Sequence, residues 1–319
     1  MEALFNKACL EHDTGLHPES AQRMMTFGPY KEIEPPFTLE HILQVHPERV
    51  VKRVEKFAKE GIPFDSDTVT SKGTYKAAVY AANLAVEAAK TENFAFIRPP
   101  GHHAFRDHPA GFCFFNNIAI AAQYLVNQGK KVLIIDFDGH FGDGTSSIFY
   151  DSNKVLFCSF HQYPAYPGTG NFDQIGHGEG EGYNINVTLP PGSGDDIIKD
   201  ALRSFMPVFK QFKPDIIGFS AGFDAHETDH LLQLRFSTFV YYYIADIFRK
   251  EFQSFFAVLE GGYEPEILNH CITNFLDGIN QRPCTYDQRS SDSSIKVWDE
   301  YIINHDQLIS KLNNYWNFK

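Results

Sequence analysis

Cysteine is scarce in this sequence and lacks the spacing of a structural framework. The cysteines are odd in number, widely scattered and without any C-x-x-C pair: Cys9, Cys113, Cys158, Cys271 and Cys284. Disulfide frameworks and thiolate zinc sites both depend on an even or clustered set of cysteines. The cysteine pattern therefore argues against both kinds of site and indicates a reducing compartment.

The sequence also lacks basic clusters, long hydrophobic runs and low-complexity segments. Its formal net charge is −12, whereas nucleic acids and anionic membranes favour proteins with a basic face. No stretch reaches the length of a membrane span, and the N-terminal MEALFNKACLEHDTG does not resemble a secretion signal. We therefore expect no direct nucleic-acid partner, no membrane contact and a cytoplasmic location, with the oligomeric state left open.

The length of 319 residues and the 43% hydrophobic content allow a large core. No linker and no internal repeat divides the chain, so we predict a single domain over residues 1–319. Residues 285–319 are polar and then weakly helical. We interpret them as a C-terminal appendage that packs on the domain.

Strand-like and helical patterns alternate along the chain. Runs typical of strands cover residues 94–97, 131–138, 155–161, 184–189, 215–220 and 255–260, and helical patterns cover 75–90, 116–128, 195–212 and 237–252. Continuous apolar strands that alternate with helices predict an α/β fold, with a mostly parallel central sheet and helices on both faces. Such sheets bind ligands at the carboxyl ends of their strands.

Polar residues follow five of these strands. The segment IDFDGHFGDGT delivers three carboxylates and one imidazole within residues 136–143, and buried charges are costly unless they are paired or bound to metal. Asp138 and His140 are two residues apart on an extended segment and point to the same side. Asp224 offers a third ligand from another strand end. Two carboxylates, one imidazole and an open position predict a catalytic zinc-type site.

Two adjacent histidines, His102 and His103, end the segment RPPGHHA. Two histidines in a row are not a motif by themselves, and exposed loop histidines are the alternative. A fixed pair of imidazoles can donate and accept protons near neutral pH. Their place at a neighbouring strand end favours the functional interpretation.

Together, RPPGHHA, GFCFFN, IDFDGHFGDGT, SAGFDAH and LEGGY resemble the zinc-dependent histone deacetylase family of the arginase/deacetylase fold. The resemblance runs from about residue 17 to residue 263, and SAGFDA and LEGGY are closer to class II and bacterial deacetylase-like amidohydrolases. It implies one Zn²⁺ per chain, held by Asp138, His140 and Asp224, which polarises the acyl carbonyl and activates water. It also implies a structural K⁺ near Asp136, His140, Ser159 and Phe160.

The resemblance further assigns catalytic roles. His102 and His103 would flank the attacking water, with His103 as the leading general base and acid. Asp136 would orient His102 and Asp143 would orient His103, since the second nitrogen of each ring needs an acceptor. Tyr263 would donate its hydroxyl to the developing oxyanion.

By the same resemblance, Phe112 and Tyr166 would form the aromatic walls of a tunnel around the acyl-lysine stem. Leu231 would line its mouth, where polyamine-specific relatives carry a carboxylate, so its apolar character favours acetyl-lysine. Asp65 and Ser66 would meet the substrate backbone, and Arg23 would line a channel beneath the metal. The predicted substrate-binding residues are Gly111, Phe112, Tyr166, Leu231 and Ser66.

The sequence departs from the family pattern at Gly139 and Phe141, where a larger apolar residue and a second histidine are common. We expect altered packing there without loss of the metal. Asp143 resembles the class I form, so the subclass is mixed. The favoured function is hydrolysis of acetyl or other short acyl groups from lysine side chains of proteins or peptides.

Three rival interpretations remain. An acetylpolyamine amidohydrolase would use the same chemistry on another substrate, and a catalytically silent module would bind acyl-lysine without turnover. An arginase-like ureohydrolase needs two manganese ions and carboxylates where this sequence has Gly142 and His226. Turnover of an acetyl-lysine peptide discriminates an enzyme from a silent binding module.

Overall fold

The computed structural model describes residues 1–318, which form a parallel eight-stranded sheet in the order β2-β1-β3-β8-β7-β4-β5-β6. All six predicted strands are present. The strands are β1 (Ala3–Phe5), β2 (Lys31–Glu32), β3 (Phe94–Ala95), β4 (Val132–Asp136), β5 (Val155–Gln162), β6 (Asn184–Leu189), β7 (Ile216–Ala221) and β8 (Phe255–Leu259). The predicted α/β class and parallel sheet are confirmed.

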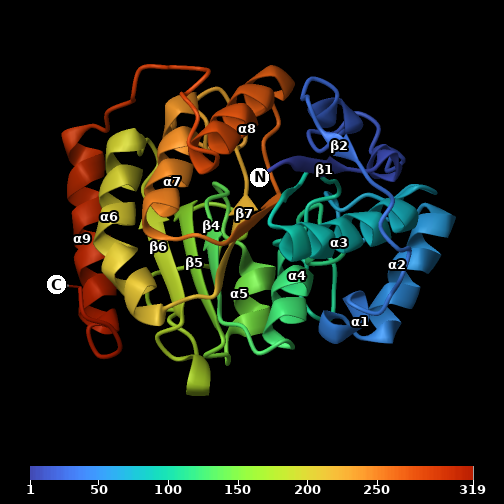
Figure 1. Cartoon of the computed structure of the whole chain (residues 1–319), viewed down its shortest axis with the longest axis horizontal. Coiled ribbons are helices and arrows are strands. Elements are labelled where there is room, and N and C mark those ends of the chain that lie inside the picture. The colour runs from blue at the N-terminus through green and yellow to red at the C-terminus, as the bar shows by residue number, and fades with distance from the viewer. Residues whose placement is uncertain (319) are drawn as a thin grey trace.

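Helices cover the sheet on both faces, with α3, α4 and α5 on one side and α6, α7 and α8 on the other (Figure 1). The α-helices are α1 (Ile42–Val45), α2 (Glu48–Glu60), α3 (Thr74–Thr91), α4 (Asn117–Val126), α5 (Asp143–Phe149), α6 (Asp195–Phe212), α7 (Thr238–Glu251), α8 (Pro265–Ile279) and α9 (Ile295–Leu312). Short 3₁₀ turns occupy Lys7–Leu10, Ala21–Met24 and Gly178–Gly180. None of the helices among residues 1–318 has the length and apolarity that a bilayer crossing requires.

The central strands are buried along their whole length because both faces of the sheet are covered, and their few polar residues, such as Asp136 and Ser159, are buried with them. Every residue of β4 and of β5 is buried, as expected for a parallel sheet between two helical layers. Strands β1 and β2 are only three and two residues long, too short to produce a periodic pattern in the sequence. The four predicted helices correspond to α3, α4, α6 and α7.

Two helices outside those predictions carry recognisable end signals. Helix α2 ends at Gly61, whose φ of 67° is the left-handed conformation that glycine adopts without strain. Helix α8 begins with Pro265 in its first turn, where the missing N–H costs no hydrogen bond. Helix α5 begins directly after the polar loop that follows β4 and so fixes the end of that loop.

The C-terminal segment packs on the rest of the chain through α9, which lies beside α6 at one side of the molecule (Figure 1). Tyr301 of α9 is 1% exposed, and its hydroxyl donates to Asp200 Oδ2 of α6 over 2.9 Å. The buried hydrophobic cluster runs from Ala3 to Leu312. The predicted appendage is therefore joined to the common core.

We expect Tyr301→Ala to lower the free energy of unfolding by about 3–5 kcal/mol, as for other buried aromatic truncations. Tyr301→Phe keeps the ring and loses only the hydrogen bond, so it should cost about 1 kcal/mol. Urea unfolding of both variants checks this. Equal stability of Tyr301→Ala and the parent chain would contradict the packing of α9. The kcat should not change in either variant, because α9 is remote from the candidate active site.

Candidate active site and metal centre

The polar residues that follow the predicted strands lie together at one edge of the sheet. Strands β3, β8, β7, β4 and β5 are consecutive in the strand order, and the carboxyl ends of parallel strands meet at the same edge. The segments 98–103, 260–263, 222–224 and 137–143 follow four of these strands. Residues that are far apart in the sequence therefore face one another there.

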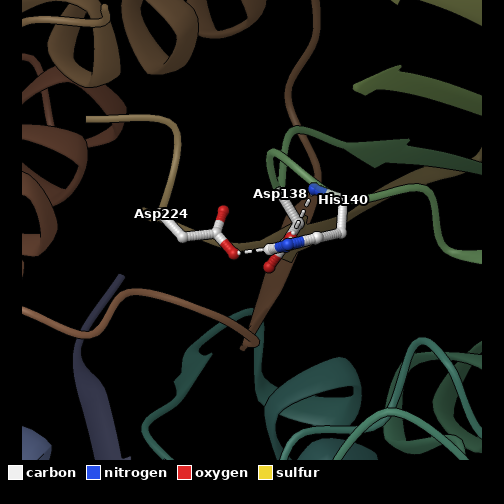
Figure 2. A group of neighbouring side chains, drawn as sticks. All are labelled: Asp138, His140 and Asp224. Atoms are coloured by element: carbon white, nitrogen blue, oxygen red, sulfur yellow. Dashed lines mark hydrogen bonds and ion pairs between the residues drawn. The ribbon is translucent and has the colours of Figure 1, made fainter. Parts of the chain in front are cut away.

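A buried group of three side chains with the donor atoms for a metal ion, the candidate metal-binding group, lies at this end of the sheet. Asp138 and His140 come from the loop after β4, and Asp224 comes from the loop after β7; their ligand atoms all lie within 4.8 Å of one another. His140 Nδ1 is 2.8 Å from Asp224 Oδ2 and 3.3 Å from Asp138 Oδ1 (Figure 2). Two carboxylates and an imidazole are ligands that zinc accepts.

The charges of this group also fit a bound cation. Burial opposes protonation of His140, but the Asp224 and Asp138 carboxylates raise its pKa to about 10. Burial and the Asp138 carboxylate raise the pKa of Asp224. Two carboxylates in a buried site need a compensating positive charge, and a metal ion would supply it in place of the His140 proton.

Glycines allow the backbone to approach these carboxylates. A β-carbon on Gly222 would lie 1.9 Å from Asp138 Oδ2, and one on Gly261 would lie 2.4 Å from Asp224 Oδ2. The Gly261 N–H donates to Asp138 Oδ2 over 2.8 Å. Gly222 of SAGFD and Gly261 of LEGGY are thus explained by close contact with the carboxylates of the candidate metal-binding group.

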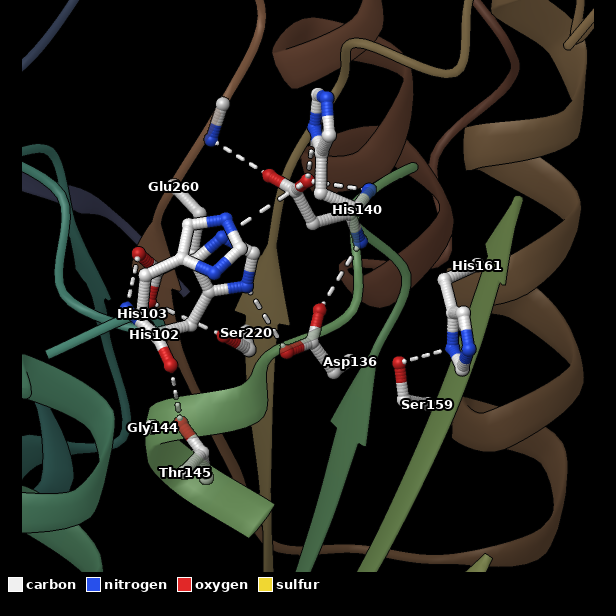
Figure 3. Close-up of polar contacts among 12 residues, drawn as sticks. His102, His103, Asp136, His140, Gly144, Thr145, Ser159, His161, Ser220 and Glu260 are labelled. Atoms are coloured by element: carbon white, nitrogen blue, oxygen red, sulfur yellow. Dashed lines mark hydrogen bonds and ion pairs between the residues drawn. The ribbon is translucent and has the colours of Figure 1, made fainter. Parts of the chain in front are cut away.

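Each of the two adjacent histidines has its own carboxylate partner. The ring centroids of His102 and His103 are 4.0 Å apart. His102 Nδ1 lies 3.2 Å from Asp136 Oδ2 (Figure 3), and His103 Nδ1 lies 2.7 Å from Asp143 Oδ1. Because both carboxylates bind Nδ1, they fix the orientation of each ring and direct Nε2 away from them.

The environment separates the proton affinities of the two rings. Burial opposes protonation of His102, but the Asp138 and Asp136 carboxylates raise its pKa well above the ordinary value. Burial and the neighbouring His102 lower the pKa of His103 to about 4. Paired groups with opposite pKa shifts are typical of acid and base assignments. In this pair, His103 is the neutral ring that can accept a proton.

A cavity of about 270 Å³ opens onto this group. It is lined by Asp67, His103, Gly111, Phe112, His140, Tyr166, Leu231 and Tyr263. The structure therefore brings most of the predicted substrate-binding residues together with one predicted metal ligand, His140, and one predicted catalytic histidine, His103. Of the two histidines, His103 lines the cavity.

Aromatic rings form part of the cavity wall. The Tyr166 ring lies edge-on to His103 with 5.1 Å between centroids, and the Phe112 ring lies edge-on to Tyr263 at 5.9 Å. Gly111 adopts a φ of 52°, and a β-carbon there would lie 2.6 Å from His103 Cδ2. The loop that carries Phe112 consequently passes directly against the His103 ring.

Tyr263 is held by groups on both sides. Its N–H donates to Asp229 Oδ2 over 2.8 Å, and the Arg23 guanidinium lies 4.9 Å from its ring centroid. Arg23 Nε in turn donates to the Gly262 carbonyl over 2.6 Å. Burial and the Asp224 carboxylate raise the pKa of Tyr263 well above its ordinary value, so the hydroxyl keeps its proton and can donate it to a hydrogen bond.

The predicted rim residues Asp65 and Ser66 lie outside the wall of this cavity, which Asp67 lines instead. Ser66 is exposed, and its hydroxyl donates to Asp67 Oδ2 over 3.1 Å. Asp65 Oδ1 accepts the N–H of Asp67 and of Thr68. Asp65 therefore shapes the turn that presents Asp67 to the cavity.

The structure accounts for the two departures from the family pattern. A β-carbon on Gly139 would lie 2.3 Å from Leu232 Cδ1, so Leu232 fills the space of a larger residue. Phe141 is 3% exposed and packs on His161, with ring centroids 4.7 Å apart. At the proposed K⁺ position, the Ser159 hydroxyl pairs with His161 Nδ1 over 2.9 Å (Figure 3), and potassium itself stays a prediction.

Three acidic residues at this site were not singled out from the sequence: Asp67, Asp229 and Glu260. Asp67 is one residue from the predicted Ser66, and Asp229 stands among polar residues that carry no burial signal. Glu260 is part of the conspicuous LEGGY motif and directly follows an apolar strand, which is a signal for a buried carboxylate. Its role became visible only from its contacts.

Known proteins resemble this chain over most of its length. The histone deacetylase domain family matches residues 13–279. A probable deacetylase of Archaeoglobus fulgidus is 41% identical over 266 residues, 77% of this chain and 71% of that protein. The chloroplastic histone deacetylase 14 of Arabidopsis thaliana is 37% identical over 311 residues, 84% of this chain and 74% of that protein. The crystal structure of the HDA15 HD domain aligns with a TM-score of 0.89 and 28% identity, over 99% of this chain and 94% of the other.

Proposed function

Because this chain belongs to the histone deacetylase family, we propose that it is a zinc-dependent hydrolase that removes acetyl or other short acyl groups from lysine side chains. The observation that carries the proposal is one cavity bordered by His140 of the metal-binding group, His103 and Tyr263. An acyl amide in this cavity would meet a metal, a base and an oxyanion donor together. The whole chain, 1–319, would act as a single catalytic domain on acetylated proteins or peptides.

The proposed metal is one Zn²⁺ held by Asp138, His140 and Asp224, whose donor set and charge fit it. Bound there, zinc would polarise the acyl carbonyl and lower the pKa of a water molecule. The structural potassium would lie near Asp136, His140, Ser159 and Phe160. Both ions are part of the proposal, and zinc is the one that the experiments below remove and restore.

The proposed proton transfers belong to the histidine pair. His103 is neutral and lines the cavity, so its Nε2 can accept a proton from the attacking water and return it to the leaving amine nitrogen. Asp143 holds the ring and stabilises the cation that forms in between. His102, whose Nδ1 lies 3.2 Å from Asp136 Oδ2, would flank the same water. Water adds to the carbonyl carbon, the carbon–nitrogen bond breaks, and acetate and lysine leave.

The tunnel supports acyl-lysine as the substrate. Phe112 and Tyr166 provide aromatic surface for an uncharged aliphatic stem, and Leu231 at the mouth is apolar. Asp67, which lines the cavity, would accept hydrogen bonds from a substrate backbone, and the role of Ser66 stays a prediction. An acetylpolyamine remains the alternative substrate, because the cavity also admits a linear acylated amine.

A ureohydrolase function is disfavoured by the second metal position. His226 pairs with Thr228 Oγ1 and Gln288 Oε1, and Gly142 offers no side-chain ligand. A silent acyl-lysine-binding module would need neither the oxyanion donor Tyr263 nor the proton acceptor His103. Cytoplasmic location and the absence of a nucleic-acid partner stay predictions of the sequence.

The test of this function is acetate release from an acetyl-lysine peptide and from N-acetylputrescine, side by side. The enzyme is assayed as purified, after chelation, and after zinc is restored. We expect peptide turnover that chelation removes and zinc restores. Turnover of the polyamine alone would overturn the substrate assignment, and peptide binding without acetate release would favour the silent module.

Tyr263→Phe should lower kcat by roughly 10²-fold or more, as expected for the loss of an oxyanion donor. The ring keeps its contact with Phe112, so KM should change little. Steady-state kinetics with the peptide measure both constants. A kcat near that of the parent enzyme would refute the role assigned to the hydroxyl.

A further inference from the structure

Glu260 is a buried carboxylate to which the proposed chemistry assigns no role. It directly follows β8 and is 0% exposed. It lies outside the cavity wall and outside the metal-binding group. A buried carboxylate is costly unless its oxygens accept hydrogen bonds, so its partners indicate why it is there.

The partners of the Glu260 carboxylate are the backbone of the histidine segment and one serine. Oε2 accepts the N–H of Gly101 over 2.7 Å and the N–H of His102 over 3.1 Å. Oε1 accepts the hydroxyl of Ser220 on β7 over 3.0 Å (Figure 3). The side chain thus links the ends of β8 and β7 to the segment that follows β3.

On its opposite side, the carbonyl groups of the same segment accept hydrogen bonds from other residues. The Thr145 N–H donates to the His102 carbonyl over 3.0 Å, and Asn116 Nδ2 donates to the Ala104 carbonyl over 3.1 Å. The segment is therefore hydrogen-bonded through both its N–H and its carbonyl groups, and Glu260 supplies the acceptor for the N–H groups. Without it, two buried N–H groups would lose their acceptor.

We propose that Glu260 is a positioning residue for the two histidines. Its carboxylate fixes the backbone from Gly101 to His102 and thereby sets where both rings stand relative to their carboxylate partners. Glu260 acts through this backbone and does not touch the substrate. The kinetic part of the inference rests on the proposed deacylase function, whereas the hydrogen-bonding part does not.

Hydrogen bonding and charge make different predictions for substitutions of Glu260. In Glu260→Gln, the amide oxygen can accept both N–H groups and the amide nitrogen can donate to Ser220 Oγ. Glu260→Asp keeps the charge, but its side chain is one methylene shorter and does not reach both N–H groups. Burial raises the pKa of Glu260 to about 7, so a neutral side chain of the same shape is a suitable replacement.

The first experiment measures kcat, KM and zinc content for Glu260→Gln, Glu260→Asp and Glu260→Ala. We expect Glu260→Asp and Glu260→Ala to lose roughly 10²-fold in kcat, because small misplacements of catalytic groups are that costly. KM should stay within about threefold, since ground-state binding is unchanged. Glu260→Gln should retain kcat within about fivefold of the parent enzyme, and zinc should remain bound in all three variants.

Two results would overturn the proposal: Glu260→Gln as impaired as Glu260→Asp, or Glu260→Asp as active as the parent enzyme. The first result would mean that the loss of kcat is due to the lost charge. The second would mean that Glu260 does not position the histidines. If Glu260→Ala does not fold, the comparison of the glutamine and aspartate variants still decides. Tyr301→Ala, which is expected to lose stability without losing kcat, controls for destabilisation.

The second experiment measures amide hydrogen exchange at Gly101 and His102 and needs no turnover. We expect faster exchange in Glu260→Asp than in the parent chain, and near-parental protection in Glu260→Gln. Equal protection in all of them would overturn the positioning role. A parent enzyme that releases no acetate but shows this exchange pattern would refute the proposed function and leave the positioning role of Glu260 intact.

Discussion

His103→Ala should lower kcat by about 10³-fold or more and leave zinc content near one per chain, as expected when a general base is lost. His103 is the histidine that lines the cavity, and burial beside His102 lowers its pKa to about 4, so the ring is neutral before the reaction begins. It lies outside the group of metal-binding side chains. Peptide kinetics and metal analysis on the same preparation check both halves of the expectation.

The matched control for this variant is His108→Ala. His108 is exposed, lies in the same loop and pairs with Asp107. We expect its removal to leave kcat unchanged. If His103→Ala lost zinc, His103 would have to be a ligand, and if it kept parental kcat, the base would have to be another residue.

Asp224→Ala should remove both the metal and the activity. The variant loses the carboxylate that approaches His140 Nδ1 to 2.8 Å and the acceptor of the Gly139 N–H. Catalytic zinc sites use three protein ligands, so two remaining ligands should bind zinc weakly. Because the metal contributes several kcal/mol to the transition state, kcat should fall by at least roughly 10³-fold.

Glu227→Ala is the matched control for Asp224→Ala. Glu227 is an exposed carboxylate three residues further along the same loop and accepts a hydrogen bond from Gln288. It should retain zinc and activity. Stoichiometric zinc in purified Asp224→Ala would contradict the ligand assignment, and full activity without zinc would contradict the proposed chemistry.

The two substitutions are informative as a pair. His103→Ala is expected to separate metal binding from turnover, whereas Asp224→Ala is expected to lose both. A silent acyl-lysine-binding module would keep peptide affinity in His103→Ala and show no acetate release in the parent chain either. The pair therefore tests the enzyme assignment as well as the individual residues.

Much of the fold was determined by the sequence itself. Continuous apolar runs such as 132–135, within the predicted strand 131–138, predict strands buried on both faces, because a parallel sheet between helices leaves no polar face. The short strands β1 and β2 were beyond prediction, since two or three residues show no periodicity. Helix α5 was also missed, since it begins at Asp143, inside a segment that the sequence marks only as polar.

The residues of the candidate active site could likewise be predicted from the sequence, because a metal-binding and catalytic set requires particular residue types at particular spacings. Asp138 and His140 are close in sequence, and the motif around Asp224 is distinctive. The tertiary structure decided which of these side chains lie together around the cavity. It placed Asp67 instead of Ser66 on the cavity wall, and it separated the pKa values of His102 and His103 through the different charges beside two buried rings.

The role of Glu260 shows the same division most clearly. The sequence determines that a carboxylate follows an apolar strand, but its partners, Gly101 and His102, lie more than 150 residues earlier. Only the adjacency of β3 and β8 in the sheet brings them within hydrogen-bonding distance. Residue types and local spacing are properties of the sequence, whereas contacts across parallel strands depend on strand order, which local patterns do not encode.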